Sequence, residues 1–337
     1  ARANLYGNGN TISLNTGSAI GVFGTNNAIT ATGNATRIYL DAPGTANSLN
    51  TVTASNLANA TATDGEAAGL YLDGGARANL YGNSNTISLN AGSAIGVFGT
   101  NNAITATGNA HVYLNAPGTA NSLNTVTASN LANATATDGE AAGLYLDGGA
   151  RANLYGNSNT ISLNTGSAIG VFGTNNAITA TGNATHVYLD APGTANSLNT
   201  VTASNLANAT ATDGEAAGLY LDGGARANLY GNGNTIGLNT GSAIGVFGTN
   251  NAITATGNAT RIYLDAPGAP NSLNTVTASN LANATATDGE AAGLYLDGGA
   301  RANLYGNGNT IGLNAGSAIG VFGTNNAITA TGNATRI

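Results

Sequence analysis

Short runs of alternating apolar and polar residues recur along the whole chain, and turns rich in glycine and asparagine separate them. Alternation over so few residues, bounded by such turns, predicts short β-strands. Helix is not expected, because β-branched residues and glycine are frequent and no run keeps the helical period. In the first 75 residues the runs are Asn4–Gly7, Thr11–Leu14, Ala19–Gly24, Ala28–Thr32, Arg37–Asp41, Thr51–Ala54, Ala58–Thr63 and Gly69–Asp73.

The runs recur because the chain repeats itself almost letter for letter. Four repeats occupy residues 1–75, 76–149, 150–224 and 225–299, and a half repeat occupies residues 300–337. A sequence with a fixed period builds one structural unit many times, and stacking these units buries a shared core. We therefore predict a single continuous all-β fold, a β-solenoid (parallel β-helix).

The eight runs of one repeat predict about four coils of two strands each, with lengths of 17, 16, 21 and 21 residues. The stretch Ser55–Gly69 matches the other coils poorly, so the last two coil boundaries are open. At a strand spacing of about 4.8 Å, four coils predict an axial repeat of about 19 Å. Both ends of the sequence fall inside the pattern, so we expect a stretch of a longer chain or a subunit that polymerises end to end.

Alternation also assigns a direction to each side chain, because successive residues of a strand point to opposite faces. The residues expected to point inward are Leu5, Ile12, Leu14, Ile20, Val22, Ile29, Ile38, Leu40, Val52, Leu70 and Leu72. Those expected to point outward are Tyr6, Ser13, Phe23, Thr30, Tyr39, Thr53 and Tyr71.

Composition narrows the classes of function. Only 7% of the residues are charged, 42% are apolar and the net charge is −7, which argues against disorder and against nucleic acid as a partner. No segment approaches the ~18 consecutive apolar residues of a membrane-spanning helix. No Ser-His-Asp set, paired carboxylates or phosphate-binding loop occurs, so we expect neither an enzyme nor a cofactor.

The aromatic residues form the first candidate site. Tyr6, Phe23 and Tyr39 fall at similar positions of successive coils, and Tyr81, Phe98 and Tyr113 repeat this column in the second repeat. An outward column of large rings is typical of an interaction surface. Three interpretations stay open at this point: cover by a neighbouring loop, lateral packing of copies of the chain, and stacking against sugar rings.

Carboxylates form the second candidate site. Asp64, Glu66 and Asp73 could contribute oxygen ligands to calcium, although capping of turns is the simpler explanation and the one we prefer. Arg37 and Asp41 share one face of a strand, which predicts a surface ion pair. His111 and His186 replace this arginine in the second and third repeats, so we interpret them as variants of the same position rather than metal ligands.

Asparagine and threonine are the remaining repeated polar residues. Asparagine tolerates left-handed backbone angles in turns, and asparagines stacked in register also bond from coil to coil. Threonine arrays such as Thr51-Val52-Thr53 resemble the ice-binding faces of some antifreeze proteins. The expected register is irregular, however, because Ala28 replaces one threonine and the next coil is expected to offer Gly69 and Tyr71.

Segments such as Gly9-Asn10-Thr11-Ile12-Ser13-Leu14-Asn15 resemble the repeats of large bacterial surface proteins, the filamentous-haemagglutinin-like and autotransporter-type adhesins. The resemblance implies a secreted, extracellular β-helix at a bacterial cell surface. We therefore expect a structural repeat protein that forms the shaft of a fibre, filament or sheath from copies of itself. The alternative is an adhesin that presents a multivalent face to glycans or, less simply, to ice.

Overall fold

The computed structural model describes the chain except residues 33–36, 44–47, 58–68, 118–122, 132–142, 165, 182–185, 192–197, 207–217, 240, 257–260, 267–272, 282–292 and 333–335. The described residues form β-strands and turns and contain no helix. They divide into two compact units, Ala1–Ser167 and Ala168–Ile337, which are described separately. The predicted all-β class is confirmed.

The strands are four to six residues long, and glycine- and asparagine-rich turns separate most of them. The unit Ala1–Ser167 contains β1 (Arg2–Leu5), β2 (Thr11–Leu14), β3 (Ala19–Val22), β4 (Ala28–Ala31), β5 (Arg37–Asp41), β6 (Asn50–Ala54), β7 (Leu70–Asp73), β8 (Arg77–Tyr81), β9 (Thr86–Leu89), β10 (Ala94–Phe98), β11 (Ala103–Thr107), β12 (His111–Asn115), β13 (Asn124–Ser129), β14 (Leu144–Asp147), β15 (Arg151–Tyr155) and β16 (Thr160–Leu163).

The unit Ala168–Ile337 continues the same order of elements. It contains β17 (Ala168–Phe172), β18 (Ala177–Ala180), β19 (His186–Asp190), β20 (Asn199–Ala203), β21 (Leu219–Asp222), β22 (Arg226–Tyr230), β23 (Thr235–Leu238), β24 (Ala243–Phe247), β25 (Ala252–Ala255), β26 (Arg261–Asp265), β27 (Asn274–Ala278), β28 (Leu294–Asp297), β29 (Arg301–Tyr305), β30 (Thr310–Leu313), β31 (Ala318–Phe322) and β32 (Ala327–Ala330).

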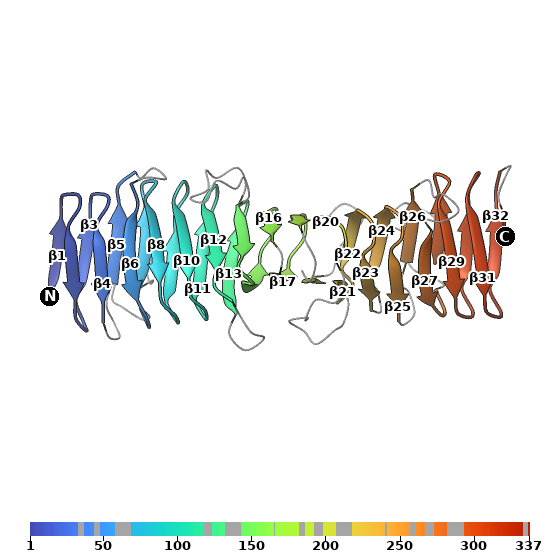
Figure 1. Ribbon diagram of the computed structural model, residues 1–337, viewed down its shortest axis with the longest axis horizontal. Coiled ribbons are helices and arrows are strands. Elements are labelled where there is room, and N and C mark those ends of the chain that lie inside the picture. Colours follow the sequence, from blue (N-terminus) through green and yellow to red (C-terminus); the bar gives the residue numbers. More distant parts are fainter. Residues whose placement is uncertain are drawn as a thin grey trace. The chain divides into compact units, whose positions relative to one another are not determined.

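Each strand pairs in parallel with the strand two places further along the chain, so each unit holds one sheet of odd-numbered and one sheet of even-numbered strands (Figure 1). In the first unit the orders are β1-β3-β5-β7-β9-β11-β13-β15 and β2-β4-β6-β8-β10-β12-β14-β16. Parallel pairing of every second strand means that the chain winds through the two sheets in turn, and two strands make one coil. The predicted β-solenoid is therefore confirmed.

The structure differs from the sequence prediction in the number of coils in a repeat. Among the described residues, each full repeat contributes seven strands, β1–β7 in the first and β8–β14 in the second, which make three and a half coils rather than four. The eighth predicted run, Ala58–Thr63, lies outside the described residues. Ile38 pairs directly with Leu70, and Thr51 pairs directly with Asn79, so the strands on either side of that run are immediate neighbours.

An odd number of strands has a geometric consequence for the whole fold. Strand β8 is the counterpart of β1 one repeat later, yet β1 belongs to the odd sheet and β8 to the even sheet. Equivalent residues of successive repeats therefore lie on opposite faces within a unit. The first counterpart of β1 that lies in the same sheet as β1 is β15, two repeats further on.

The core consists of the aliphatic residues that alternation predicts. Val22, Ile38, Leu40, Val52 and the two leucines of β7 are fully buried, while the outward residues Ser13, Thr30 and Thr53 are exposed. Leu5 and Ile12 are only half-buried because they belong to the first coil, which has a neighbouring coil on one side only. Their counterparts Leu80 and Ile87 are fully buried.

A ladder of asparagines inside the turns joins neighbouring coils, as the sequence predicts. The backbone N–H and side-chain amide of Asn85 both donate to Oδ1 of Asn102, at 2.9 and 3.0 Å, and the backbone N–H of Asn102 donates to Oδ1 of Asn124 at 2.9 Å. These asparagines are about 1% exposed. Such buried amides stabilise one register because a slip would leave them without partners.

Candidate interaction surface

The predicted column of aromatic residues forms a continuous ladder of rings within each repeat. The Tyr6 and Phe23 rings stack at 4.8 Å, the Phe23 and Tyr39 rings meet edge to face at 5.9 Å, and Tyr39 stacks on Tyr71 at 5.5 Å. Ring pairs at such separations stabilise the sheet beyond the area that they bury. The ladder thus includes a fourth ring, Tyr71, in addition to the three predicted members.

The second repeat has the same ladder, formed by Tyr81, Phe98, Tyr113 and Tyr145. It lies on the even sheet, whereas the ladder of the first repeat lies on the odd sheet. The aromatic residues therefore do not form one stripe along one face of a unit. They form separate segments that alternate between the two faces.

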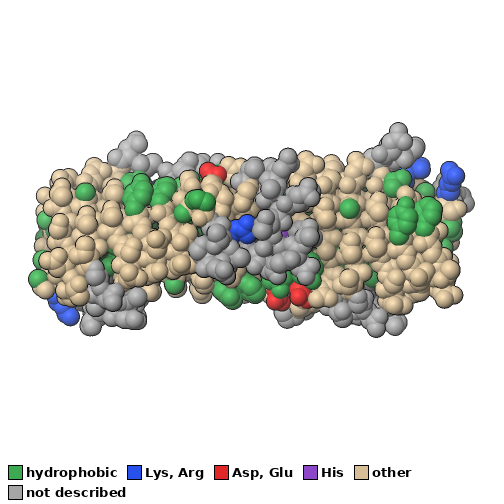
Figure 2. Space-filling view, turned by 60° about the horizontal axis from the view of Figure 1, so that its bottom comes forward, with side chains coloured by type: hydrophobic (Ala, Val, Ile, Leu, Met, Phe, Trp, Pro, Cys, Tyr) green, Lys and Arg blue, Asp and Glu red, His purple; other side chains and the backbone are tan. Residues whose placement is uncertain are grey.

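Exposure varies strongly along a ladder. Tyr81 is 44% exposed, the middle rings Phe98 and Tyr113 are half-buried, and Tyr145 is only 8% exposed. Tyr71 points outward as predicted, beside Tyr39, but it is also only 8% exposed. Figure 2 shows the result on one side of the molecule, where hydrophobic side chains form patches on a surface that is mostly polar and uncharged.

Arg37 does not lie at the surface, where the predicted ion pair would place it. The residue is fully buried, and its guanidinium lies over the Tyr71 ring, 5.3 Å from the ring centroid. Asp41 instead accepts a hydrogen bond from the Tyr39 hydroxyl at 3.0 Å. His111 and His186, which replace the arginine in two repeats, are also fully buried. A cation over a tyrosine ring in a dry site contributes more than an exposed ion pair does.

Of the three candidate calcium ligands, Asp73 lies among the described residues. Asp64 and Glu66 lie outside the described residues, whereas Asp73 ends β7. The Asp73 carboxylate accepts hydrogen bonds from the backbone N–H of Gly74 at 2.8 Å and from Nδ2 of Asn90 at 3.1 Å, as expected for a residue that caps a turn. No group of three or more His, Cys, Asp or Glu residues that could hold a metal ion occurs among the described residues.

A second kind of surface lies on the face opposite each ladder. It consists of exposed hydroxyls, such as Ser13 paired with Thr30 and Thr30 paired with Thr53. The strand that follows Thr53 in the sheet contributes Asn79 and Tyr81, not the expected Gly69 and Tyr71. The hydroxyl surface of one repeat therefore ends against the first ring of the next. The sequence pattern does not predict this border, because the four-coil register places a further coil between the two surfaces.

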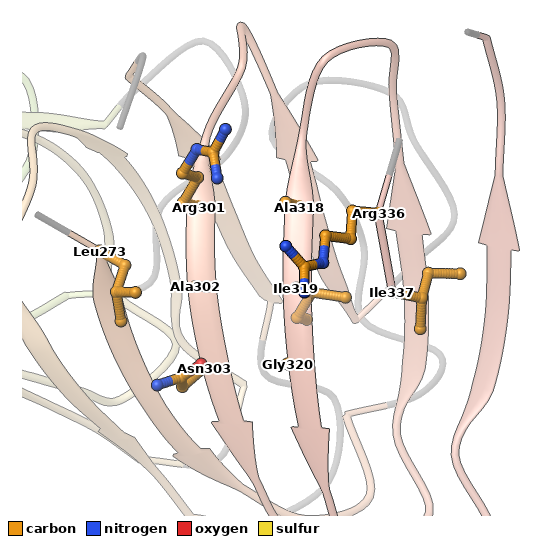
Figure 3. Close-up of a pocket in the computed structure, with 9 residues that line it drawn as sticks. All are labelled: Leu273, Arg301, Ala302, Asn303, Ala318, Ile319, Gly320, Arg336 and Ile337. Carbon is orange, nitrogen blue, oxygen red and sulfur yellow. The ribbon is translucent and has the colours of Figure 1, made fainter. Parts of the chain in front are cut away.

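The end of the chain holds a further pocket, shown in Figure 3. Arg301 and Asn303 of β29 and Arg336, which lies beside β31, supply its polar groups, and the two guanidinium groups point in different directions. Its other lining residues are apolar or glycine. The described side chains that line this pocket therefore supply no hydroxyl, imidazole, thiol or carboxylate that could act as a nucleophile or base.

Comparisons with protein-family models, with curated proteins and with solved structures found no match. No helix in the described part of the chain is long and apolar enough to cross a membrane. The fold itself defines the class, a repeat protein with a parallel β-solenoid architecture.

Proposed function

We propose that this β-solenoid is structural material, the shaft of an extracellular fibre, filament or sheath that is built from copies of the same chain. One observation carries the proposal: the described residues repeat the same coils, asparagine ladders and ring ladders in every repeat. An enzyme normally needs one distinct pocket with an acid, base or nucleophile. Repeated uncharged ladders instead make the stacked coils rigid. We therefore also propose that the protein is not an enzyme and has no cofactor.

The same forces that join the coils could join separate copies. Half-exposed rings on both faces of a unit offer apolar contacts for lateral packing. Because these rings alternate between two opposite faces, side-by-side association would extend into a layer rather than stop at a pair.

The location follows from the same reasoning and from the resemblance to bacterial surface repeats. A solenoid with few charged residues and no cysteine has no thiol that must be kept reduced, and hydroxyls and amides are frequent on its surface. We propose an extracellular position at a bacterial cell surface. Immunogold labelling of intact cells, with permeabilised cells as the control, tests this proposal.

The spacing along the fibre tests the proposed assembly. A repeat of three and a half coils rises about 17 Å, and seven coils pass before the same surface returns to the same face, a period of about 34 Å. We expect fibre diffraction or electron microscopy of the assembled protein to show this period together with the strand spacing of about 4.8 Å. A preparation that contains only compact, isolated molecules at high concentration would refute the proposal of assembly.

A further inference from the structure

Two shallow hollows on the hydroxyl surface lie at equivalent positions in successive repeats and share most of their lining. One lies between β18, β20 and β22 and is lined by Thr179, Thr181, Thr202, Ser204, Asn205 and the ring of Tyr230, with small alanines between them. The other is lined by threonine, alanine, serine and asparagine one repeat later, from Thr254 to Asn280. Tyr305 is not among its lining residues, but it pairs in register with Thr277, which is. Among the described residues, none that lines either hollow is charged.

The hollow exists because small side chains meet a large ring at the border between repeats. Thr202 on β20 pairs in register with Tyr230 on β22. The Tyr230 ring stacks on Phe247 of the following strand at 4.8 Å with an interplanar angle of 13°, so its opposite face is turned toward Thr202. Tyr230 is 42% exposed. Its outer face therefore forms a wall at the side of the hydroxyl surface.

The polar groups beside this wall are available to a ligand. Thr179 and Thr202 are exposed on their strands, and their hydroxyl groups make no hydrogen bond to another described residue. The Ser204 hydroxyl accepts a hydrogen bond from the backbone N–H of Asn232 at 3.2 Å, which leaves its own hydrogen free to donate outward. The hollow thus combines an aromatic face with uncharged donors and acceptors.

We propose that these hollows bind a neutral polysaccharide, with the C–H face of a sugar on the tyrosine ring and sugar hydroxyls bonded to the threonine and serine hydroxyls. The absence of charge in the lining selects against an anionic ligand. The same border recurs at Tyr81, Tyr155, Tyr230 and Tyr305, which are 44%, 43%, 42% and 42% exposed. Repeated weak sites suit a repeating ligand, because the contacts of one polymer chain add.

This binding function goes beyond the fibre proposal and does not depend on it. In each unit the two complete borders lie on opposite sheets, for example Thr53 with Tyr81 on the even sheet and Thr127 with Tyr155 on the odd sheet. One molecule would therefore bind polysaccharide on two faces and crosslink two chains. The aromatic candidates Phe98 and Tyr113 lie further along the ladder from the border and are not part of this site.

Affinity electrophoresis in native gels tests the proposal on the full chain. The gels contain hydroxyethylcellulose, galactomannan or a soluble β-glucan, and alginate serves as the anionic comparison. We expect retardation by at least one neutral polymer. Replacement of Tyr81, Tyr155, Tyr230 and Tyr305 by alanine should raise the polymer concentration for half-maximal retardation by about tenfold or more, because each ring loses its buried face. The tyrosine-to-phenylalanine set should retain most of the retardation.

A second set of variants, at threonines, tests the proposal even if the alanine variant fails to fold. Thr53→Val, Thr127→Val, Thr202→Val and Thr277→Val together remove the hydroxyls that face the rings and should weaken binding severalfold. The matched control changes Thr51, Thr125, Thr200 and Thr275 to valine. These threonines pair with asparagines rather than tyrosines, so the control variant should bind the polysaccharide normally. Equal retardation of all folded variants, retardation by alginate alone, or none with any neutral polymer would overturn the proposal.

Discussion

Asparagine has two different roles in this chain, and two adjacent asparagines take one role each. Asn26 adopts a left-handed backbone conformation, with φ of 59°, and forms the turn. Asn27 is buried and bonds through its side chain to Gly7 and Asn50. The first role uses the conformational tolerance of asparagine, whereas the second uses its ability to donate and accept at once. The sequence predicts both roles but cannot assign them, because the letters are identical.

Removal of one ladder asparagine tests the second role. We expect Asn102→Ala to lower the free energy of unfolding by about 2–3 kcal/mol, because the buried backbone N–H of Asn85 loses its acceptor. The matched control is Asn79→Ala on the outer face of β8, which should change stability by less than about 1 kcal/mol. Urea unfolding followed by circular dichroism measures both. Equal effects of the two substitutions would contradict a special contribution from the ladder.

At the scale of strands and coils, alternation predicts directions well and environments less well. It assigned Ile38, Leu40 and Val52 to the core correctly, because the period of two depends only on the local backbone. Arg37 and Tyr71 point outward, as the exposed residues do, yet both are buried. Alternation did not predict this burial. Burial on an outer face depends on which other segments pass over it, and no local pattern contains that information.

The number of coils in a repeat was also beyond the local pattern. Eight runs of similar character suggested eight strands, whereas direct pairing of β5 with β7 and of β6 with β8 gives seven. The difference of one strand reverses the face of each following repeat. The interaction surface was therefore predicted in composition but not in position: the rings were found, but their alternation between faces and their border with the hydroxyl surface were not.

Engineered disulfides distinguish seven strands from eight, and the chain contains no cysteine that would interfere. Thr53 and Tyr81 are cross-strand partners on the even sheet, so Thr53→Cys with Tyr81→Cys should form an intramolecular disulfide under mild oxidation. The four-coil register would instead pair Thr53 with Tyr71, which lies on the odd sheet. We expect no disulfide for that second pair. Mass spectrometry of peptides from the oxidised protein reports either bond, and the reverse result would refute the observed register.

At the scale of the whole molecule, the low charge density decides which force can join copies. The chain carries fifteen acidic residues against eight basic ones, and charged residues are 7% of the total. Surface ion pairs between such copies would be few, and each contributes under about 1 kcal/mol in solution. Contacts between rings and small side chains, which salt does not screen, are the stronger candidates for lateral packing.

The response of assembly to salt and pH follows from this balance. We expect sodium chloride up to about 0.5 M to leave assembly unchanged or to promote it, because salt screens the mutual repulsion of copies that each carry a net charge of −7. Lowering the pH toward the isoelectric point near 4.5 should also promote assembly, since protonation of carboxylates brings the net charge toward zero. Light scattering with electron microscopy at each condition measures the extent of assembly and its form. Fibres that dissolve as salt is raised would show instead that ion pairs join the copies, and the aromatic segments would then have a different role.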